Sequence, residues 1–443
     1  MPRNCLQQFE ALTGSQLFRR KTDMTTLTPA RKACNGAPGG MRERPRVDVH
    51  AGGQEKPVSG ASLGINAKSN NKPMETRVQR FALQSVARSI LPESRTAKCL
   101  RIRSHGQEIQ VWKHHEHNTA AYGGLQTCGS VWACPVCSAK IAERRRAEVQ
   151  AAMGVHKARG GCVQLLTLTA PHQRKDSLFD LLAKQAKALK TFWNDRAVKA
   201  VLVEMGVVGQ IRALEVTHGR KSPHNNGWHP HYHILLFAGS GVDLSLFNKA
   251  QMTHWQVVLY LRWAAACVKA GLGEPTYANG LKLDGGDKAS KYVTKWGLED
   301  EMTKGHTKKA LHGETPFDFL RAFLADKSDK QAAALFKEFA ETFKGKRQLY
   351  WSKGLKAMFS IEEATDEELL TRVEEEAVLL GLLTIDQWRD VLKVDARATV
   401  LEIAAHSGWH EVQRYLWFIE GAHKGVQFEK EMLVEARALF LEG

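Results

Sequence analysis

Residues 229–237 have the sequence HPHYHILLF, in which alternating histidines lead into four apolar residues. Successive side chains of a strand point to opposite faces, so a strand here places His231 and His233 on one face. His229 joins them if the strand extends back beyond the proline. Neutral imidazoles bind divalent metal ions, and a strand fixes their spacing. The stretch therefore predicts a metal site, and a polar strand edge with incidental histidines is the alternative.

A third ligand is expected from the preceding strand. Residues 210–216 (QIRALEV) have the β-branched and aliphatic character of a strand, and residues 218–227 contain the Gly, Pro and Asn of a turn. A hairpin between the two strands would bring Glu215 beside the histidine pair. The alternative for Glu215 is an ordinary surface carboxylate.

Further strands and helices are expected around this hairpin. Residues 163–169 (VQLLTLT) have the composition of a buried strand. Helices are predicted over residues 178–194, 254–270 and 288–297. Strands interleaved with helices predict an α+β fold with a central antiparallel sheet, flanking helices and the histidine strand in the middle of the sheet.

The charge is distributed unevenly along the chain. The 443 residues include 63 Lys and Arg and 47 Asp and Glu, a net charge of +16. Residues 361–443 hold 8 basic and 18 acidic residues, so the rest of the chain is strongly basic. A basic body favours a polyanionic partner, of which nucleic acid is the commonest.

Composition excludes several classes of protein. There is no run of 18 apolar residues, and the N-terminus lacks the apolar core of a signal peptide, so we expect no membrane partner. Eight cysteines, unevenly spread, are not typical of a disulfide scaffold. A reducing cytoplasm is the expected location.

Three of the cysteines have the spacing of a metal site. Cys128, Cys134 and Cys137 form a C-x5-C-x2-C pattern that suits tetrahedral Zn²⁺. Cys99 is the expected fourth ligand. Three nearby histidines compete for that position: His114, His115 and His117. The alternative for the whole group is free thiols in a reducing cell.

A basic run follows the cysteines. Arg144, Arg145 and Arg146 are consecutive, and Trp132 lies between the cysteines. Arginine binds phosphate well, so this run predicts DNA contacts made by a small cysteine-rich module.

Residues 291–296 (KYVTKW) contain a candidate nucleophile. On a helix, Tyr292 and Lys295 are neighbours on one face. A tyrosine hydroxyl has a pKa of about 10 and is a poor nucleophile without help. A nearby ammonium and a metal-polarised electrophile would supply that help. Taken alone, the pattern is also typical of a half-buried packing tyrosine.

The sequence resembles the rolling-circle plasmid replication initiator (Rep) family of the HUH endonuclease superfamily. Three ordered motifs of that family have counterparts here, and the segments TPF at 315–317 and YWSKGL at 350–355 are also similar. The resemblance covers about residues 98–359. The three motifs are LLTLT at 165–169, HPHYHILL at 229–236 and KYVTK at 291–295. No chemistry is assigned to the first.

The resemblance implies both a fold and a reaction. The implied fold is an HUH-type sheet domain, and the implied cofactors are Mg²⁺ or Mn²⁺ at the nicking site and a structural Zn²⁺. Tyr292 would attack a phosphate of single-stranded DNA and form a 5′-phosphotyrosine with a free 3′-OH. The implied partners are plasmid origin DNA, duplex and single-stranded, and a host helicase and polymerase.

One position departs from the family pattern. Many relatives carry a glutamate four residues before the tyrosine, as the base in termination, whereas this chain has Lys288. Asp287 or a more distant acid such as Glu299 is the expected substitute, or termination proceeds differently.

Four segments are expected along the chain. Residues 1–75 predict a disordered basic segment, residues 76–160 a cysteine-rich zinc module, and residues 161–360 the HUH nuclease and strand-transferase domain. Residues 361–443 predict a helical acidic region. Within it, residues 399–418 have two apolar segments around Gly408 and predict packing or self-association in preference to a helix-turn-helix.

Two other functions fit parts of the sequence. An HUH transposase or conjugative relaxase would share the chemistry, although the Gly-x4-Gly-Lys-Ser/Thr loop of a relaxase-linked helicase does not occur. A non-catalytic zinc-dependent DNA-binding regulator would need the cysteines and the basic charge but neither the histidines nor Tyr292. The second tyrosine near a family-like motif is Tyr350.

Overall fold

The computed structural model of the chain describes residues 72–114, 118–223, 225–239, 249–294, 313–371 and 377–423. All of these belong to one compact unit, Ala67–Gly443. Within the described ranges, no helix has the length and apolarity needed to cross a membrane.

The expectation of disorder over residues 1–75 concerns mainly residues 1–71, which lie outside the described residues. At its end the expectation is wrong, because helix α2 begins at Lys72 and runs to Ile90. Good helix formers such as Met74 and Glu75 precede the buried Phe81 and Leu83, so the helix continues upstream of the residues that bury its apolar face.

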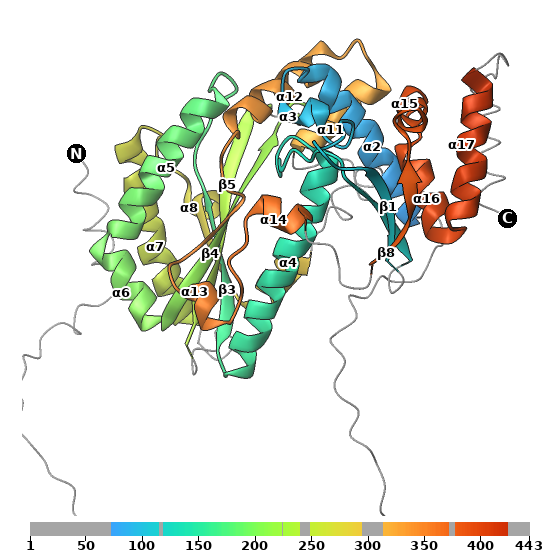
Figure 1. Cartoon of the computed structure of the whole chain (residues 1–443). Helices are drawn as coiled ribbons and strands as arrows, with labels where there is room; N and C mark the ends of the chain where they lie inside the picture. The colour runs from blue at the N-terminus through green and yellow to red at the C-terminus, as the bar shows by residue number, and fades with distance from the viewer. Residues whose placement is uncertain are drawn as a thin grey trace, which may run out of the picture. The chain divides into compact units, whose positions relative to one another are not determined.

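The larger of two antiparallel sheets has five strands in the order β6-β3-β5-β4-β7 (Figure 1). The histidine strand β5 lies in the middle, as predicted. The chain is thus a mixed α/β protein with antiparallel sheets. The strands are β3 (Cys162–Thr169), β4 (Val207–His218), β5 (Trp228–Ala238), β6 (Leu281–Asp284) and β7 (Leu349–Trp351).

One face of this sheet is covered by α5, α6 and α7 (Figure 1). Its core joins apolar residues of alternate sheet positions, such as Leu166, Ile234 and Leu236, to Phe192 and Trp263 of the helices. The helices on this side are α5 (Leu178–Asn194), α6 (Arg196–Glu204), α7 (Lys249–Ala270), α8 (Tyr277–Gly280), α11 (Pro316–Ala325) and α12 (Lys330–Thr342).

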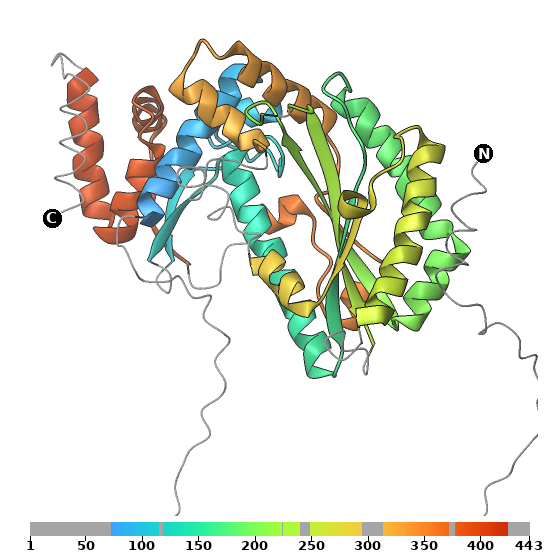
Figure 2. The same ribbon diagram turned by 180° about the vertical axis from the view of Figure 1, so that it is seen from behind.

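The opposite face is covered by α4 (Pro135–Ala158), α9 (Gly286–Thr294) and α13 (Leu355–Met358). From behind, the gold helix α9 is seen beside α4 (Figure 2). Ala289 and Val293 of α9 pack against Leu165 and Leu235 of the sheet. Because Leu235 is two residues beyond His233, the histidines share this face.

A second antiparallel sheet has the order β2-β1-β8 and a core of its own. Its strands are β1 (Ile109–His114), β2 (Thr119–Gly123) and β8 (Ala377–Leu383). Its neighbourhood also includes α2, α3 (Arg95–Lys98), α15 (Ile385–Lys393), α16 (Arg397–His406) and α17 (Trp409–His423). Helix α14 (Asp366–Thr371) instead contacts α4.

The expected acidic C-terminal region is therefore not helical throughout. The apolar run AVLLGLL at 377–383 has no helical periodicity and forms β8, which pairs with β1 from the cysteine-rich part of the chain. The expected boundaries after residues 160 and 360 stay predictions. The break at Gly408 is confirmed, since this glycine separates α16 from α17 with a φ of +83°.

The other predicted elements agree with the structure. The expected helix over residues 178–194 coincides with α5, and the three expected strands of the large sheet are each present with longer bounds. The helix expected over residues 288–297 is α9, which begins at Gly286, and residues 295–297 lie outside the described residues.

Replacing Gly381 with alanine should destabilise the small sheet. A Cβ at this position of β8 would overlap the indole ring of Trp409, the first residue of α17. Overpacking of this kind costs about 1–3 kcal/mol. We expect Gly381→Ala to lower the free energy of unfolding by that amount in denaturant titrations followed by tryptophan fluorescence.

Gly421→Ala provides the matched control in the same region. Nothing lies within 4 Å of a Cβ at Gly421, which is in α17. Alanine should leave stability unchanged or raise it by up to about 1 kcal/mol. Equal stability of the two variants would contradict the packing of β8 against α17.

Candidate metal centre and cysteine site

The β4–β5 hairpin brings together three of the four predicted metal ligands. Glu215 is paired with His231, and Ala213 with His233, in the antiparallel register. Directly opposed residues and residues two apart share a face. The small side chain of Ala213 lies across from His233, and Glu215 lies directly across from His231. The hairpin predicted from the sequence is thus confirmed.

Distances between the three side chains fit a divalent ion. His231 Nε2 lies 3.5 Å from Glu215 Oε2, and His233 Nε2 lies 3.7 Å from the same oxygen. One ligand atom from each residue lies within 4.8 Å of the others. Neighbouring ligand atoms of an ion with bonds of about 2.1 Å are roughly 3.0–3.4 Å apart, so small side-chain movements complete the site.

Hydrogen bonds at the other ring nitrogens orient both imidazoles. His233 Nδ1 lies 3.0 Å from Thr167 Oγ1, and His231 Nδ1 lies 3.3 Å from the carbonyl oxygen of His229. Each Nδ1 that carries a proton can donate to its oxygen, which leaves the Nε2 lone pair for a metal. Thr167 belongs to the first family-like motif, for which the sequence analysis predicted no chemistry.

His229 lies beside the metal group and outside it. Its Nδ1 is 2.7 Å from Nε2 of His172, whose Nδ1 is 2.9 Å from the carbonyl oxygen of Asn226. Since a carbonyl only accepts, His172 donates from Nδ1, and when neutral it accepts a hydrogen bond at Nε2 from the Nδ1–H of His229. A ligand role for His229 stays a prediction. The sequence analysis did not identify His172 as a partner of His229, because His172 follows a different strand.

Burial favours the neutral imidazoles of His229 and His233. It lowers the pKa of His229 to about 3, with further lowering by His231 and His172. Burial also lowers the pKa of His233, and this outweighs the opposing effect of Glu215. Neutral rings are the forms that bind metal.

The predicted nucleophile lies on the helix that covers the histidine face. Tyr292 is in the last turn of α9, next to Val293, which packs against the sheet. Its side chain, that of Asp287, and all of Lys295 and Glu299 lie outside the described residues. Lys288, which stands where relatives have a glutamate, forms an ion pair with Asp284 at the end of β6.

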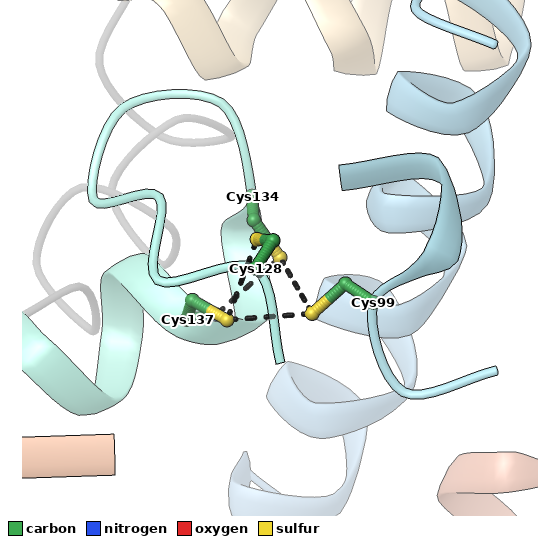
Figure 3. A group of neighbouring side chains, drawn as sticks. All are labelled: Cys99, Cys128, Cys134 and Cys137. Carbon is green, nitrogen blue, oxygen red and sulfur yellow. Dashed lines mark hydrogen bonds between the residues drawn. The ribbon is translucent and has the colours of Figure 1, made fainter. Parts of the chain in front are cut away.

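The four predicted zinc ligands converge in one buried cluster (Figure 3). Sulfur–sulfur distances are 3.4 Å between Cys99 and Cys137, 3.7 Å between Cys128 and Cys137 and 3.7 Å between Cys134 and Cys99. Zinc–thiolate bonds of about 2.3 Å in a tetrahedron set sulfur atoms about 3.8 Å apart, so the group fits Zn²⁺.

Polar groups around the sulfurs favour a thiolate at Cys134, whereas hydrogen bonds among the sulfurs raise the pKa of Cys99 and of Cys137. The backbone N–H of Cys137 and the side-chain amide of Gln84 donate to Cys134 Sγ at 3.5 and 3.3 Å. Burial opposes ionisation of Cys134, but hydrogen bonds from the other three cysteines more than offset it and hold its pKa well below the usual value. Cys99 is the fourth member, in place of the described His114; His115 and His117 lie outside the described residues.

The predicted DNA-binding arginines are engaged within the protein. Arg145 forms ion pairs with Asp366 at 2.8 Å and Glu148 at 3.0 Å, and these raise its pKa despite burial. Arg144 donates to the carbonyl oxygen of Leu369, and Arg146 pairs with Glu143. DNA binding by this run stays a prediction. The sequence alone did not reveal the acidic partners of Arg145 and Arg146, because residue spacing does not show which side chains meet in the fold.

Comparison with known proteins identifies a matching family. Residues 124–264 match the family model described as "Replication protein". The matched segment includes Glu215, His231 and His233, and it ends before α9.

Two curated proteins are similar to this chain. "Protein rep" of Streptomyces lividans is 27% identical over 353 residues, covering 63% of this chain and 76% of that protein. "Neomycin resistance protein" of Streptomyces cyanogenus is 32% identical over 144 residues, covering 27% of this chain and 32% of that protein. No solved structure matches the chain.

Thr167→Val should weaken metal binding without unfolding the protein. Valine keeps the shape of the side chain but removes the oxygen that faces His233 Nδ1. Loss of such an orienting group typically costs 10–100-fold in metal affinity. We expect at least a tenfold weaker Mn²⁺ affinity by calorimetry, with Thr167→Ser close to the unchanged chain. Unaltered Mn²⁺ affinity in Thr167→Val would show that Thr167 does not orient the histidine.

The cysteine site should contain about one equivalent of zinc in protein purified under reducing conditions. We expect Cys134→Ser to lose it, because one of four ligands is removed. Cys162→Ser is the matched control, since Cys162 lies outside the cluster and should leave the zinc content unchanged. Elemental analysis measures both, and zinc-free protein would remove the zinc assignment.

Proposed function

We propose that this chain, a member of the Rep family of plasmid replication initiators, begins replication by nicking one DNA strand at the plasmid origin. The observation that carries the proposal is that Glu215, His231 and His233 share a sheet face with α9, the helix of Tyr292. A metal group and a tyrosine helix on one face are what metal-assisted attack on a phosphate requires. An HUH-type fold is part of this proposal.

The metal ligands and the residues behind them have separate roles. Glu215, His231 and His233 would hold Mg²⁺ or Mn²⁺, which would stabilise the negative charge that builds on a phosphate during displacement. Thr167 keeps the His233 ring oriented through Nδ1. His172 holds His229 in the same way, at the edge of the group.

Tyr292 supplies the nucleophile in the proposed reaction. The tyrosine hydroxyl gives up its proton and its oxygen bonds to phosphorus, while the bond from phosphorus to the 3′ oxygen breaks and the 3′ oxygen takes up a proton. The products are a 5′-phosphotyrosine and a free 3′-OH. One phosphoester replaces another, so rejoining needs no ATP. Lys295 would favour ionisation of the tyrosine through its positive charge.

Tyr350 is a poorer candidate for the nucleophile. It is paired with Arg212 in the register of β4 and β7, whereas Ala213 is paired with His233. Neighbouring positions of a strand face opposite ways, so Tyr350 lies on the face away from the histidines. Its ring instead packs over the guanidinium of Arg212, with 4.6 Å between ring centroid and Cζ.

A carboxylate for the termination step is available near Lys288. Asp284 is paired with Leu165, which packs on the histidine face, and its side chain forms the ion pair with Lys288. We include Asp284 with Asp287 and Glu299 as candidate bases. The acid and the lysine together would replace the single glutamate of the family pattern.

The alternative functions make different demands on the same residues. A transposase or relaxase of the HUH type would use the same metal group and tyrosine on different DNA. A zinc-dependent regulator would bind DNA without any covalent step. Origin-dependent formation of an adduct therefore separates initiation from both.

Tyr292→Phe should abolish the covalent adduct with DNA, because only the attacking oxygen is removed. We expect less than a thousandth of the adduct formed by the unchanged chain on single-stranded origin DNA with Mn²⁺, with DNA binding retained. Mass spectrometry of the DNA–peptide adduct names the residue and the polarity.

Two further variants complete the experiment. His231→Ala with His233→Ala should also lose nicking, while Tyr350→Phe should keep it. If Tyr292→Phe still becomes linked to DNA, the nucleophile is another residue. If the double histidine variant nicks in the presence of a chelator, the metal assignment is wrong.

A further inference from the structure

A short exposed loop carries three basic residues between α12 and β7. Residues 344–347 have the sequence Lys-Gly-Lys-Arg, and all four are exposed. Within the described part of the chain, no ion pair is found for Lys344, Lys346 or Arg347. This basic loop differs in that respect from Arg145 and Arg146 of α4, which are paired to carboxylates.

The basic loop leads into β7, at the level of the metal group. Leu349 is paired with Ala213, and the backbone N–H of Leu214 donates to the carbonyl oxygen of Gln348 at 3.3 Å. In an antiparallel pair, one residue further back on β7 corresponds to one further forward on β4. Arg347, just before β7, therefore lies at the level of Glu215.

The cysteine site holds the other end of this loop. Trp132 lies between Cys128 and Cys134, and its indole N–H donates to the carbonyl oxygen of Lys346 at 2.7 Å. The Trp132 ring also packs edge-on against Phe343, just before the loop, with ring centroids 4.6 Å apart. A residue between two cysteines of the cluster thus fixes the peptide that joins Lys346 to Arg347.

We propose that the basic loop, residues 344–347, binds phosphates of the DNA strand that enters the metal centre, and that the cysteine site positions this loop through Trp132. The inference rests on the proposed action on DNA. Lysine and arginine side chains held on a fixed backbone bind phosphate oxygens by charge-assisted hydrogen bonds. The cysteine site then acts on DNA binding through the chain and need not touch DNA itself.

The test compares two variants with the same loss of charge. In one, Lys344, Lys346 and Arg347 are all changed to Ala. In the other, Lys184, Lys187 and Lys190, which are exposed on α5, are changed to Ala. Fluorescence anisotropy measures binding of a labelled 30-nucleotide strand and of its duplex over a range of KCl concentrations, in EDTA so that no cleavage occurs.

We expect the loop variant to bind the single strand at least tenfold more weakly. Each lost phosphate contact reduces the slope of log K against log salt by about 0.7 for a single strand, so the slope should fall by about 2. The α5 variant should change little. Equal weakening in both variants, or weakening for the duplex alone, would overturn the assignment of the loop to the entering strand.

The link to the cysteine site is tested separately. Trp132→Phe retains an aromatic ring against Phe343 but lacks the N–H that reaches Lys346. We expect it to keep its zinc and to bind the single strand several-fold more weakly. Cys134→Ser should lose both zinc and this affinity, with circular dichroism reporting whether the fold persists.

These outcomes are independent of nicking. Unchanged binding by a folded, zinc-retaining Trp132→Phe would overturn the positioning role of Trp132. If DNA binding depends on the loop although Tyr292 forms no adduct, the loop assignment stands and the proposed reaction fails. If the adduct forms but the loop variant binds normally, the proposed reaction stands and the loop assignment fails.

Discussion

The register between β4 and β5 is the constraint on which the metal group depends. Glu215 is opposite His231 only because Ala213 is opposite His233, and all three ligands face α9. A shift of one residue would turn the side chains of one strand to the other face of the sheet. Apolar residues prevent this shift, because Ile211 and Leu235 pack on one side of the same strands while Leu214 and Leu236 pack on the other.

The sequence predicted the parts of the site that depend on periodicity within one strand or one loop. Alternation in HPHYHILLF indicated His231 and His233, and cysteine spacing indicated the thiolate cluster. Hydrogen bonds between strands distant in sequence were not predictable in the same way. Thr167 and His233 are 66 residues apart, and His172 and His229 are 57 apart. Residue type alone does not distinguish a threonine that orients a histidine from one that fills a core strand.

The acidic C-terminal region has a structural explanation that charge counting missed. Asp366 of α14 pairs with Arg145, and backbone oxygens of Leu369 and Leu370 accept hydrogen bonds from Arg144 and Lys140. The charge of Arg145, which the sequence assigned to DNA contacts, is thus neutralised by a carboxylate 221 residues away in sequence, while Arg144 is held by a backbone carbonyl. Strand β8 was missed for a related reason, since a short apolar run becomes a strand or a buried helix according to its partners.

The two candidate metal sites differ in ligand chemistry and therefore in role. Four buried thiolates suit zinc in a closed structural site, whereas two imidazoles and a partly exposed carboxylate leave positions for a phosphate on a harder ion. Trp132 and the chain from Phe343 to Leu349 connect them, because one end contacts the cysteine loop and the other pairs with β4. A closed site that fixes backbone can thus determine how substrate approaches an open site without supplying a ligand to it.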